Sequence, residues 1–236
     1  MSKKYLIFIG FLAISTAIFS QKDRVENLPT FDKRILHYGF YLGLNQNDFK
    51  LNVKENSFGV KPRNITIEPT TGFNVGLIVD MRLHKNLNLR FEPGLISNTK
   101  KIIFNALDNP KDSIQEASST FLHVPLVFKM STDRYQNIRP YLLAGISYDF
   151  NLSSNEKNQY DNFSGEFRMK THNFMYELGI GIDIYFYYFK FSPSIRGVFS
   201  LTNEIKFDNE ANGASPWTDP INFMGTRGLF INFAFE

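Results

Sequence analysis

The sequence predicts an all-β protein, an eight-stranded antiparallel transmembrane outer-membrane β-barrel, and three observations carry this prediction. Eight segments alternate apolar and polar side chains with a period of two, the period of a strand. The apolar face of each segment contains no Asp, Glu, Lys or Arg. The connections are alternately short and long, as in barrels with short periplasmic turns and long extracellular loops.

The first twenty residues differ from the rest of the chain. Lys3 and Lys4 precede an uncharged apolar run over residues 5–19, and the small residue Ser20 follows it. This order is typical of a cleaved signal peptide, and the run is shorter than the roughly 20 residues that a spanning helix needs. An N-terminal membrane anchor is the alternative. The expected divisions are a signal peptide at 1–20, a periplasmic segment at 21–33 and the barrel at 34–236.

The eight alternating segments are the expected strands. In chain order they cover residues 36–45, 72–84, 87–95, 122–130, 141–150, 174–184, 189–201 and 228–235. Several of their apolar faces run for about ten residues, which suits a tilted membrane strand of roughly 9–11 residues. Strands of soluble proteins have about 5–6 residues. The length therefore favours a barrel in lipid over the alternative, a soluble sheet with one wet face.

The connections between these segments support the same topology. Short turns are expected at residues 84–86, 131–139 and 185–188, and long loops at 46–70, 99–119, 153–172 and 202–222. The long connections are rich in Asn, Asp, Lys, Ser and Gly, as solvated loops are. An even number of strands places both termini in the periplasm, and closure removes unpaired edges that lipid does not tolerate.

The polar faces carry five acids and five bases, which we expect inside the barrel. They are Asp80, Arg82, Arg90, Glu92, Lys129, Asp149, Glu177, Asp183, Lys190 and Arg196. Eight strands enclose an interior that side chains just fill, and buried charge must be paired. Inward glycines would leave room for the long charged side chains. We therefore expect a structural network of lumenal ion pairs, with a polar conduit or a proton-coupled site as the alternative.

No catalytic, cofactor or metal site is predicted. The chain has no Cys, and His37, His84, His123 and His172 lack the spacing of metal ligands. A net charge of +3 that is spread along the chain does not suggest a nucleic-acid partner. We expect no enzyme and no small-molecule substrate; a lipid-modifying enzyme is the remaining alternative of that kind.

Three apolar residues outside the predicted strands are candidate partner contacts. Leu28 and Phe31 lie in the N-terminal segment, where they would bind a periplasmic partner or plug the barrel. Trp217 lies in a loop with two prolines, where it would contact a partner or the lipid interface. The strand at 228–235 resembles the C-terminal signal of barrel assembly, from which the additional Glu236 departs.

Three segments resemble a known family. Residues 121–129 (FLHVPLVFK) and 139–145 (RPYLLAG) resemble strand signatures of the PorT family of Bacteroidota outer-membrane barrels. Residues 27–45 are similar to the start of the mature proteins of that family. The resemblance covers essentially the whole mature chain, and the family has no known catalytic residues to assign.

This resemblance implies a component of the type IX secretion system, which moves folded cargo across the outer membrane and supports adhesin export for gliding. The expected function is that of a non-enzymatic structural or assembly component in the cell outer membrane. Its partners would be outer-membrane lipid and other outer-membrane or periplasmic proteins of the machinery. A stand-alone surface adhesin or an envelope-stabilising barrel is the alternative.

Overall fold

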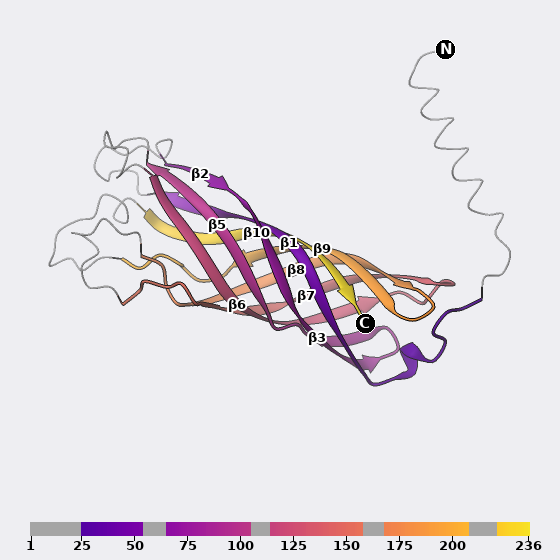
Figure 1. Ribbon diagram of the computed structural model, residues 1–236. Helices are drawn as coiled ribbons and strands as arrows, with labels where there is room; N and C mark the ends of the chain where they lie inside the picture. Colours follow the sequence, from indigo (N-terminus) through magenta and orange to yellow (C-terminus); the bar gives the residue numbers. More distant parts are fainter. Residues whose placement is uncertain (1–24, 54–64, 105–113, 158–167, 208–220) are drawn as a thin grey trace, which may run out of the picture.

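A computed structural model shows a closed antiparallel barrel (Figure 1). It describes residues 25–53, 65–104, 114–157, 168–207 and 221–236, with residues 104 and 114–119 described by their backbone alone. The elements are η1 (Phe31–Lys33), β1 (Leu36–Val53), β2 (Ile65–Pro69), β3 (Thr71–His84), β4 (Leu87–Phe91), β5 (Gly94–Phe104), β6 (Ile114–Ser131), β7 (Ile138–Asn151), β8 (His172–Tyr185), β9 (Lys190–Ser200) and β10 (Ile221–Phe235). In these residues no helix is long and apolar enough to cross a membrane.

The ten strands form the eight wall segments that the sequence predicts, and each such segment is called a stave below. β2 and β3 are one stave interrupted at Thr70, and β4 and β5 are one stave interrupted before Gly94. Pro93 causes the second interruption because it has no N–H for the ladder, although its carbonyl still accepts from Leu77 N at 2.9 Å. β1 pairs with both β3 and β10, which closes the cylinder.

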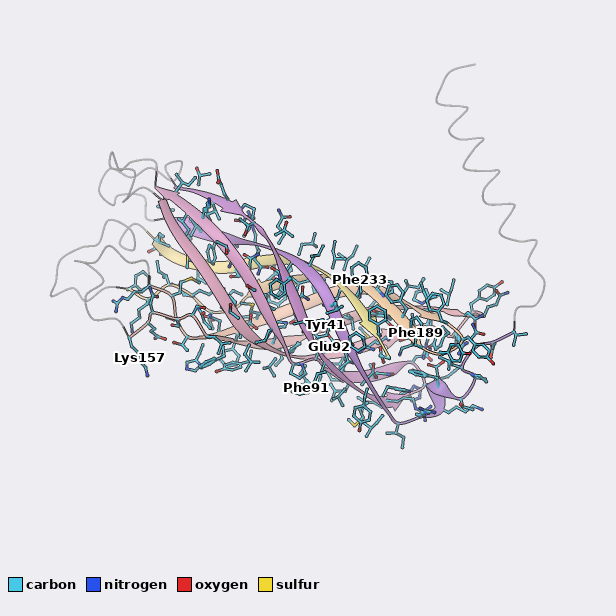
Figure 2. The ribbon with its side chains drawn as sticks, in the orientation of Figure 1. Tyr41, Phe91, Glu92, Lys157, Phe189 and Phe233 are labelled. Atoms are coloured by element: carbon cyan, nitrogen blue, oxygen red, sulfur yellow. The ribbon has the colours of Figure 1, made fainter. Side chains whose placement is uncertain are left out.

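Alternate side chains point to the two sides of the wall, as predicted. Leu77 and Ile180 point outward and are 64% and 60% exposed, whereas Ile78, next in the chain, is buried. In Figure 2, Phe91 and Phe233 lie on the outer surface, and Glu92 lies inside. An outer surface of this kind is stable only in hydrocarbon, because so large an apolar area is unfavourable in water.

An aromatic cluster lies at the end of the barrel that has the short turns. Phe186, Tyr187, Tyr188 and Phe189 form the β8–β9 turn, and Tyr188 is 85% exposed. The Phe189 ring lies 6.1 Å from the ring of Phe235 in β10. Aromatic side chains of this kind settle at the membrane–water interface. Because short turns are periplasmic in outer-membrane barrels, this end is the periplasmic one.

The strands are longer than the sequence predicted at the opposite end. Residues 46–53 and 65–69 were expected in a loop, as were residues 99–104 and 114–119, yet all are strand. The prediction ended each strand where the outward apolar face ends, at Leu44 in β1. Backbone pairing continues beyond that level, to Val53↔Ile221 between β1 and β10. Outward residues there are polar because they meet water, while backbone groups still need partners.

The interior also differs from the expected polar filling in its outer half. An apolar cluster lies inside the long-loop end and consists of Phe49, Ile102, Met169, Ile205, Ile221 and Met224. A second apolar cluster follows toward the periplasm and includes Ile96, Phe121 and Phe230. The inward charges are concentrated in the periplasmic half. The lumen therefore has its apolar clusters in the outer half and most of its charges in the inner half. Two buried charges also lie in the outer half, where Thr226 accepts from Lys100 and donates to Glu204.

The inward glycines were predicted to leave room for charged side chains, and most of them do not. Tyr41 lies across Gly76, where a Cβ atom would be 2.6 Å from Tyr41 Cε1, and its hydroxyl donates to Glu92 O at 3.3 Å. Gly179 does match the expectation, since a Cβ there would lie 2.9 Å from Cγ of Arg196. Tyrosine rings thus fill part of the space that glycine opens.

Candidate functional site

The candidate site is the charged half of the lumen, with Arg90 of β4 at its centre. The Arg90 side chain is fully buried and contacts three carboxylates. Its Nη2 lies 2.6 Å from Asp80 Oδ2 and 2.7 Å from Glu236 Oε1, and its Nη1 lies 3.3 Å from Glu92 Oε1. These groups meet because each of them lies at a position whose side chain points into the lumen, on or directly after β3, β4 and β10. A guanidinium with several forked donors suits this arrangement.

A second group of charges lies one layer nearer the long loops. Arg196 of β9 binds Glu92 through both terminal nitrogens, with Nη2 at 3.0 Å from Oε1. His123 of β6 lies between Asp149 and Glu177, with Nδ1 2.5 Å from Asp149 Oδ1 and Nε2 3.0 Å from Glu177 Oε1. Both ring nitrogens can donate only in the doubly protonated imidazole.

A third group lies toward the periplasm and contains two lysines. Lys129 Nζ lies 2.7 Å from Asp183 Oδ2, and Ser192 donates to the same carboxylate at 2.6 Å. Lys190 Nζ lies 3.0 Å from Glu236 Oε2. Each buried cation in this group therefore faces a carboxylate, which offsets the cost of burying it.

Nine of the ten residues predicted for the network lie buried in these groups. They are Asp80, Arg90, Glu92, Lys129, Asp149, Glu177, Asp183, Lys190 and Arg196. The tenth, Arg82, is only partly buried at the periplasmic end, where it donates to the Asp32 carbonyl at 2.7 Å. Glu236 and His123 also belong to the network, although neither is among the ten predicted residues. The signal for Glu236 was present, because it continues the inward parity of Asn232 and Ala234.

Side chains pack closely in the charged layer of the described barrel. The space bounded by Tyr41, Glu92, His123, Glu177 and Arg196 is too small to hold a water molecule. Among the described residues, no set of three His, Cys, Asp or Glu side chains is placed to hold a metal ion. The arrangement can stabilise the barrel, since its side chains fill the space that they bound in the lumen.

The N-terminal residues 25–33, which we name the plug segment, cover the periplasmic mouth. The Phe31 ring stacks on His37 at 4.4 Å between centroids, and Lys190 Nζ lies 4.8 Å from the centre of the Phe31 ring. His37 Nε2 lies 2.8 Å from Phe31 O. Phe31 thus lies partly buried at the mouth with Leu28 beside it, and a hollow of about 360 Å³ remains between these residues, His37 and Glu236.

Asp32 fixes the plug segment to the barrel. Its carboxylate accepts from the Tyr185 hydroxyl at 2.7 Å and from Arg139 Nη1 at 3.3 Å. Arg134 lies 3.7 Å away and also donates to the Leu28 carbonyl at 3.4 Å. These partners come from the β6–β7 turn, β7 and β8, so one side chain connects the segment to adjacent staves. The third candidate contact, Trp217, lies outside the described residues.

Replacing Asp32 with Ala should release the plug segment more often without unfolding the barrel. The substitution leaves the donors of Tyr185 and Arg139 without their acceptor, at a cost of about 1–2 kcal/mol. Opening should therefore become about 5–30-fold more frequent. Trypsin cleavage after Lys33, followed by mass spectrometry of the protein in detergent, measures this rate. Asp133→Ala is the control, because Asp133 pairs with Lys85 and contacts no plug residue; equal cleavage of both variants would contradict the anchoring role.

Two carboxylates outside the membrane-spanning strands have lowered pKa values. The backbone N–H of Thr171 donates to Glu156 at 2.8 Å and lowers the pKa of that carboxyl in the β7–β8 loop. The Lys85 ammonium beside Asp133 lowers the pKa of Asp133 in the β6–β7 turn. Both are surface interactions that stabilise loop conformation, and neither contacts the lumenal network.

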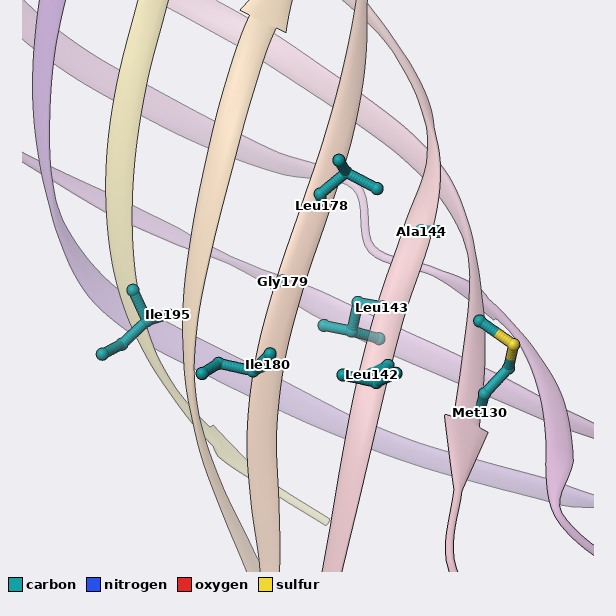
Figure 3. A pocket seen from close by; sticks show the side chains of 8 residues that line it. All are labelled: Met130, Leu142, Leu143, Ala144, Leu178, Gly179, Ile180 and Ile195. Atoms are coloured by element: carbon teal, nitrogen blue, oxygen red, sulfur yellow. The ribbon is translucent and has the colours of Figure 1, made fainter.

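The outer wall has a shallow apolar hollow of about 430 Å³ over β7 and β8, where Ala144 and Gly179 are small (Figure 3). It is lined by Met130, Leu142, Leu143, Ala144, Leu178, Gly179, Ile180 and Ile195. The lining has no titratable group and no nucleophile. The hollow therefore suits an acyl chain of the surrounding lipid and offers no catalytic chemistry.

Comparison with known proteins agrees with this architecture. A family model described as an outer membrane protein beta-barrel domain matches residues 19–206. The chain belongs to this family. It is accordingly an outer-membrane protein in contact with lipid. A search of curated proteins finds no match to the chain.

Several solved structures are similar to this barrel. Neisserial surface protein A is 9% identical with a TM-score of 0.46, over 84% of this chain and 97% of that one. OprG from Pseudomonas aeruginosa is 15% identical with a TM-score of 0.46, over 85% and 93%. AlkL, solved in DMPC bilayers, is 11% identical with a TM-score of 0.43, over 92% of both chains. All three are outer-membrane or surface proteins by name.

Proposed function

We propose that this outer-membrane barrel is a non-enzymatic structural or assembly component of the type IX secretion machinery. The observation that carries the proposal is the occluded lumen, which is filled by ion pairs and covered by the plug segment. A barrel without a passage acts through its surfaces, by contact with lipid and with neighbouring proteins. The resemblance of residues 27–45, 121–129 and 139–145 to the PorT family supplies the link to that machinery.

The filled lumen also supports a second candidate, a stand-alone adhesin or envelope-stabilising barrel. That function needs the same closed wall and the same exposed loops, and it needs no secretion partner. A lipid-modifying enzyme is the weakest candidate. Its nucleophile and base would have to reach the lipid-facing surface. His37 and His123 point inward and are buried, and the exposed His172 lies against the hydroxyl of Tyr148.

Deletion of the gene in its source organism, followed by assay of exported cargo, tests the leading proposal. We expect type IX cargo to disappear from the medium and to accumulate in the periplasm, and plasmid-borne wild type to restore export. Detergent sensitivity of the same strains controls for general envelope damage. Normal export from the deletion strain would contradict the secretion role, and detergent sensitivity with normal export would favour the envelope-stabilising role.

Affinity purification from membranes tests the predicted partners. A tagged copy should bring down outer-membrane barrels or lipoproteins of the secretion machinery when it is solubilised in mild detergent. Recovery of the barrel alone, from a strain that secretes normally through the tagged copy, would contradict a stable place in the assembly.

A further inference from the structure

A hollow of about 360 Å³ lies at the periplasmic edge of the barrel, between the plug segment and the start of β1. Its lining combines plug residues, residues 34 and 36–38, Tyr188 of the β8–β9 turn and Glu236 after β10. A volume of this size is in the range of small-ligand sites, which is about 300–1,000 Å³. Neither the lumenal network nor the proposed function gives this hollow a role.

One side of the hollow belongs to the lipid-facing surface. Leu36 and Tyr38 point outward from β1 and are 43% and 67% exposed, and Tyr188 is 85% exposed. Leu36 and Tyr38 are the first members of the apolar outward face of β1. Aromatic side chains such as Tyr38 and Tyr188 settle at the membrane–water interface. The hollow is therefore reached by the lipids of the periplasmic leaflet.

The described N-terminal chain approaches the mouth from a different turn. Asn137 of the β6–β7 turn accepts from Asn27 N at 2.9 Å and donates to the Val25 carbonyl at 3.1 Å. The hollow instead lies beside β1 and the β8–β9 turn. The plug segment therefore borders the hollow, and no described residue fills it.

Arg34 places a positive charge at the hollow that no described carboxylate neutralises. It lines the hollow and is exposed, and none of the ion pairs among the described residues includes it. The nearest acid along the chain, Asp32, is bound to Tyr185 and Arg139. A guanidinium in this position suits a phosphate, which it can bind through two parallel hydrogen bonds.

His37 adds an unfilled acceptor to the same lining. The residue is 6% exposed, and its Nδ1 has no hydrogen-bond partner among the described residues. Because Nε2 lies 2.8 Å from the Phe31 carbonyl, which can only accept, Nε2 carries the proton and Nδ1 of the neutral ring is an acceptor. Buried polar atoms are normally paired, so a ligand with an N–H donor suits this position. The negative charge of Glu236, which also lines the hollow, favours a cationic donor.

We propose that this hollow binds the phosphoethanolamine headgroup of a phospholipid from the periplasmic leaflet. Arg34 binds the phosphate, and His37 accepts a hydrogen bond from the ammonium. Leu36 and Tyr38 contact the first methylene groups of the acyl chains. The bound lipid packs against Phe31 and so connects the plug segment to the membrane. This site does not depend on the secretion role.

Native mass spectrometry of the full mature protein, released from a non-ionic detergent after titration with lipid, tests the site. The probes are phosphatidylethanolamine and phosphatidylcholine with the same acyl chains, because the trimethylated headgroup has no N–H for His37. We expect one retained phosphatidylethanolamine per barrel, with an affinity about three- to tenfold higher than that of phosphatidylcholine. Arg34→Gln should weaken its binding by about tenfold, the effect of one charge-assisted hydrogen bond.

Lys33→Gln is the matched control, because Lys33 is an exposed neighbouring cation that does not line the hollow, and it should retain lipid as wild type does. Equal retention by the two variants, equal affinities for the two lipids, or the absence of any retained lipid would overturn the proposal. Soluble phosphoethanolamine lacks acyl chains and should not displace the lipid; displacement at equal concentration would overturn the assignment to a membrane lipid. Replacement of residues 21–24 by a Gly-Ser sequence should leave retention unchanged, and increased retention would assign the hollow to the chain's own N-terminal residues instead.

Discussion

Arg90→Met should lower the free energy of unfolding by about 3–5 kcal/mol, since removal of one member of a buried charge network leaves the others uncompensated. Asp80 and Glu236 would lose the guanidinium that contacts both of them. Methionine has a similar length and leaves little cavity, so the lost charge accounts for most of the change. Urea-induced unfolding of the barrel in detergent micelles, followed by tryptophan fluorescence of Trp217 and by circular dichroism, measures it.

Arg227→Met is the matched control for this experiment. Arg227 also pairs with a carboxylate, that of Asp48, but on the exposed outer face, where such pairs contribute about 1 kcal/mol or less. The double variant Arg90→Met, Asp80→Leu should recover part of the stability, because it removes one uncompensated carboxylate while Glu236 keeps Lys190 as its partner. A loss for Arg90→Met no larger than that of Arg227→Met would contradict the structural role of the lumenal network.

Ile180→Arg should destabilise the barrel by about 2–4 kcal/mol, since Ile180 points outward from the middle of β8 and Arg at the bilayer midplane carries that cost. Unfolding from liposomes by urea measures the difference from wild type. Gln46→Arg is the control, because Gln46 points outward just beyond the apolar face of β1, where the cost falls to about 0–1 kcal/mol. Equal effects at both positions would indicate a sheet exposed to water.

The outward face and the strand count could be predicted from the sequence because hydrocarbon imposes a strict rule. Every second residue of a spanning strand must be uncharged, so the outward positions of β8, from Phe174 to Ile184, appear directly in the sequence. The ends of the strands could not be predicted in this way. Beyond Leu44 the outward residues meet water and follow no apolar rule, although the backbone ladder continues to Val53.

The interior could be predicted only in part. The alternation of side chains along the strands assigned Asp80, Arg90 and Glu92 to the lumen. It gave no information on which carboxylate each guanidinium contacts, because that depends on the register between neighbouring strands. Glu236 was overlooked because it was regarded as a departure from the terminal strand signal. Its parity places it among the lumenal charges, where it contacts Arg90 and Lys190.

The plug segment illustrates a different limit of the sequence. Its apolar residues, Leu28 and Phe31, suit a partner surface as well as a plug. The choice depends on Asp32, whose partners Tyr185 and Arg139 lie more than a hundred residues away along the chain. Contacts of this kind leave no periodic signal. In the structure Phe31 packs on His37 at the mouth, and Asp32 binds the barrel beside it.

The central claim is that the lumen of this barrel is closed to ions. Conductance measured in planar lipid bilayers is the most direct test of it. The purified mature protein should insert and give no stable current above the lipid baseline across the physiological range of voltage. An inactive preparation is excluded by showing that the same sample is folded by circular dichroism and resists trypsin. A large, stable conductance from folded protein would contradict the account, because ions would then pass the layer that Arg90, Glu92 and Arg196 fill.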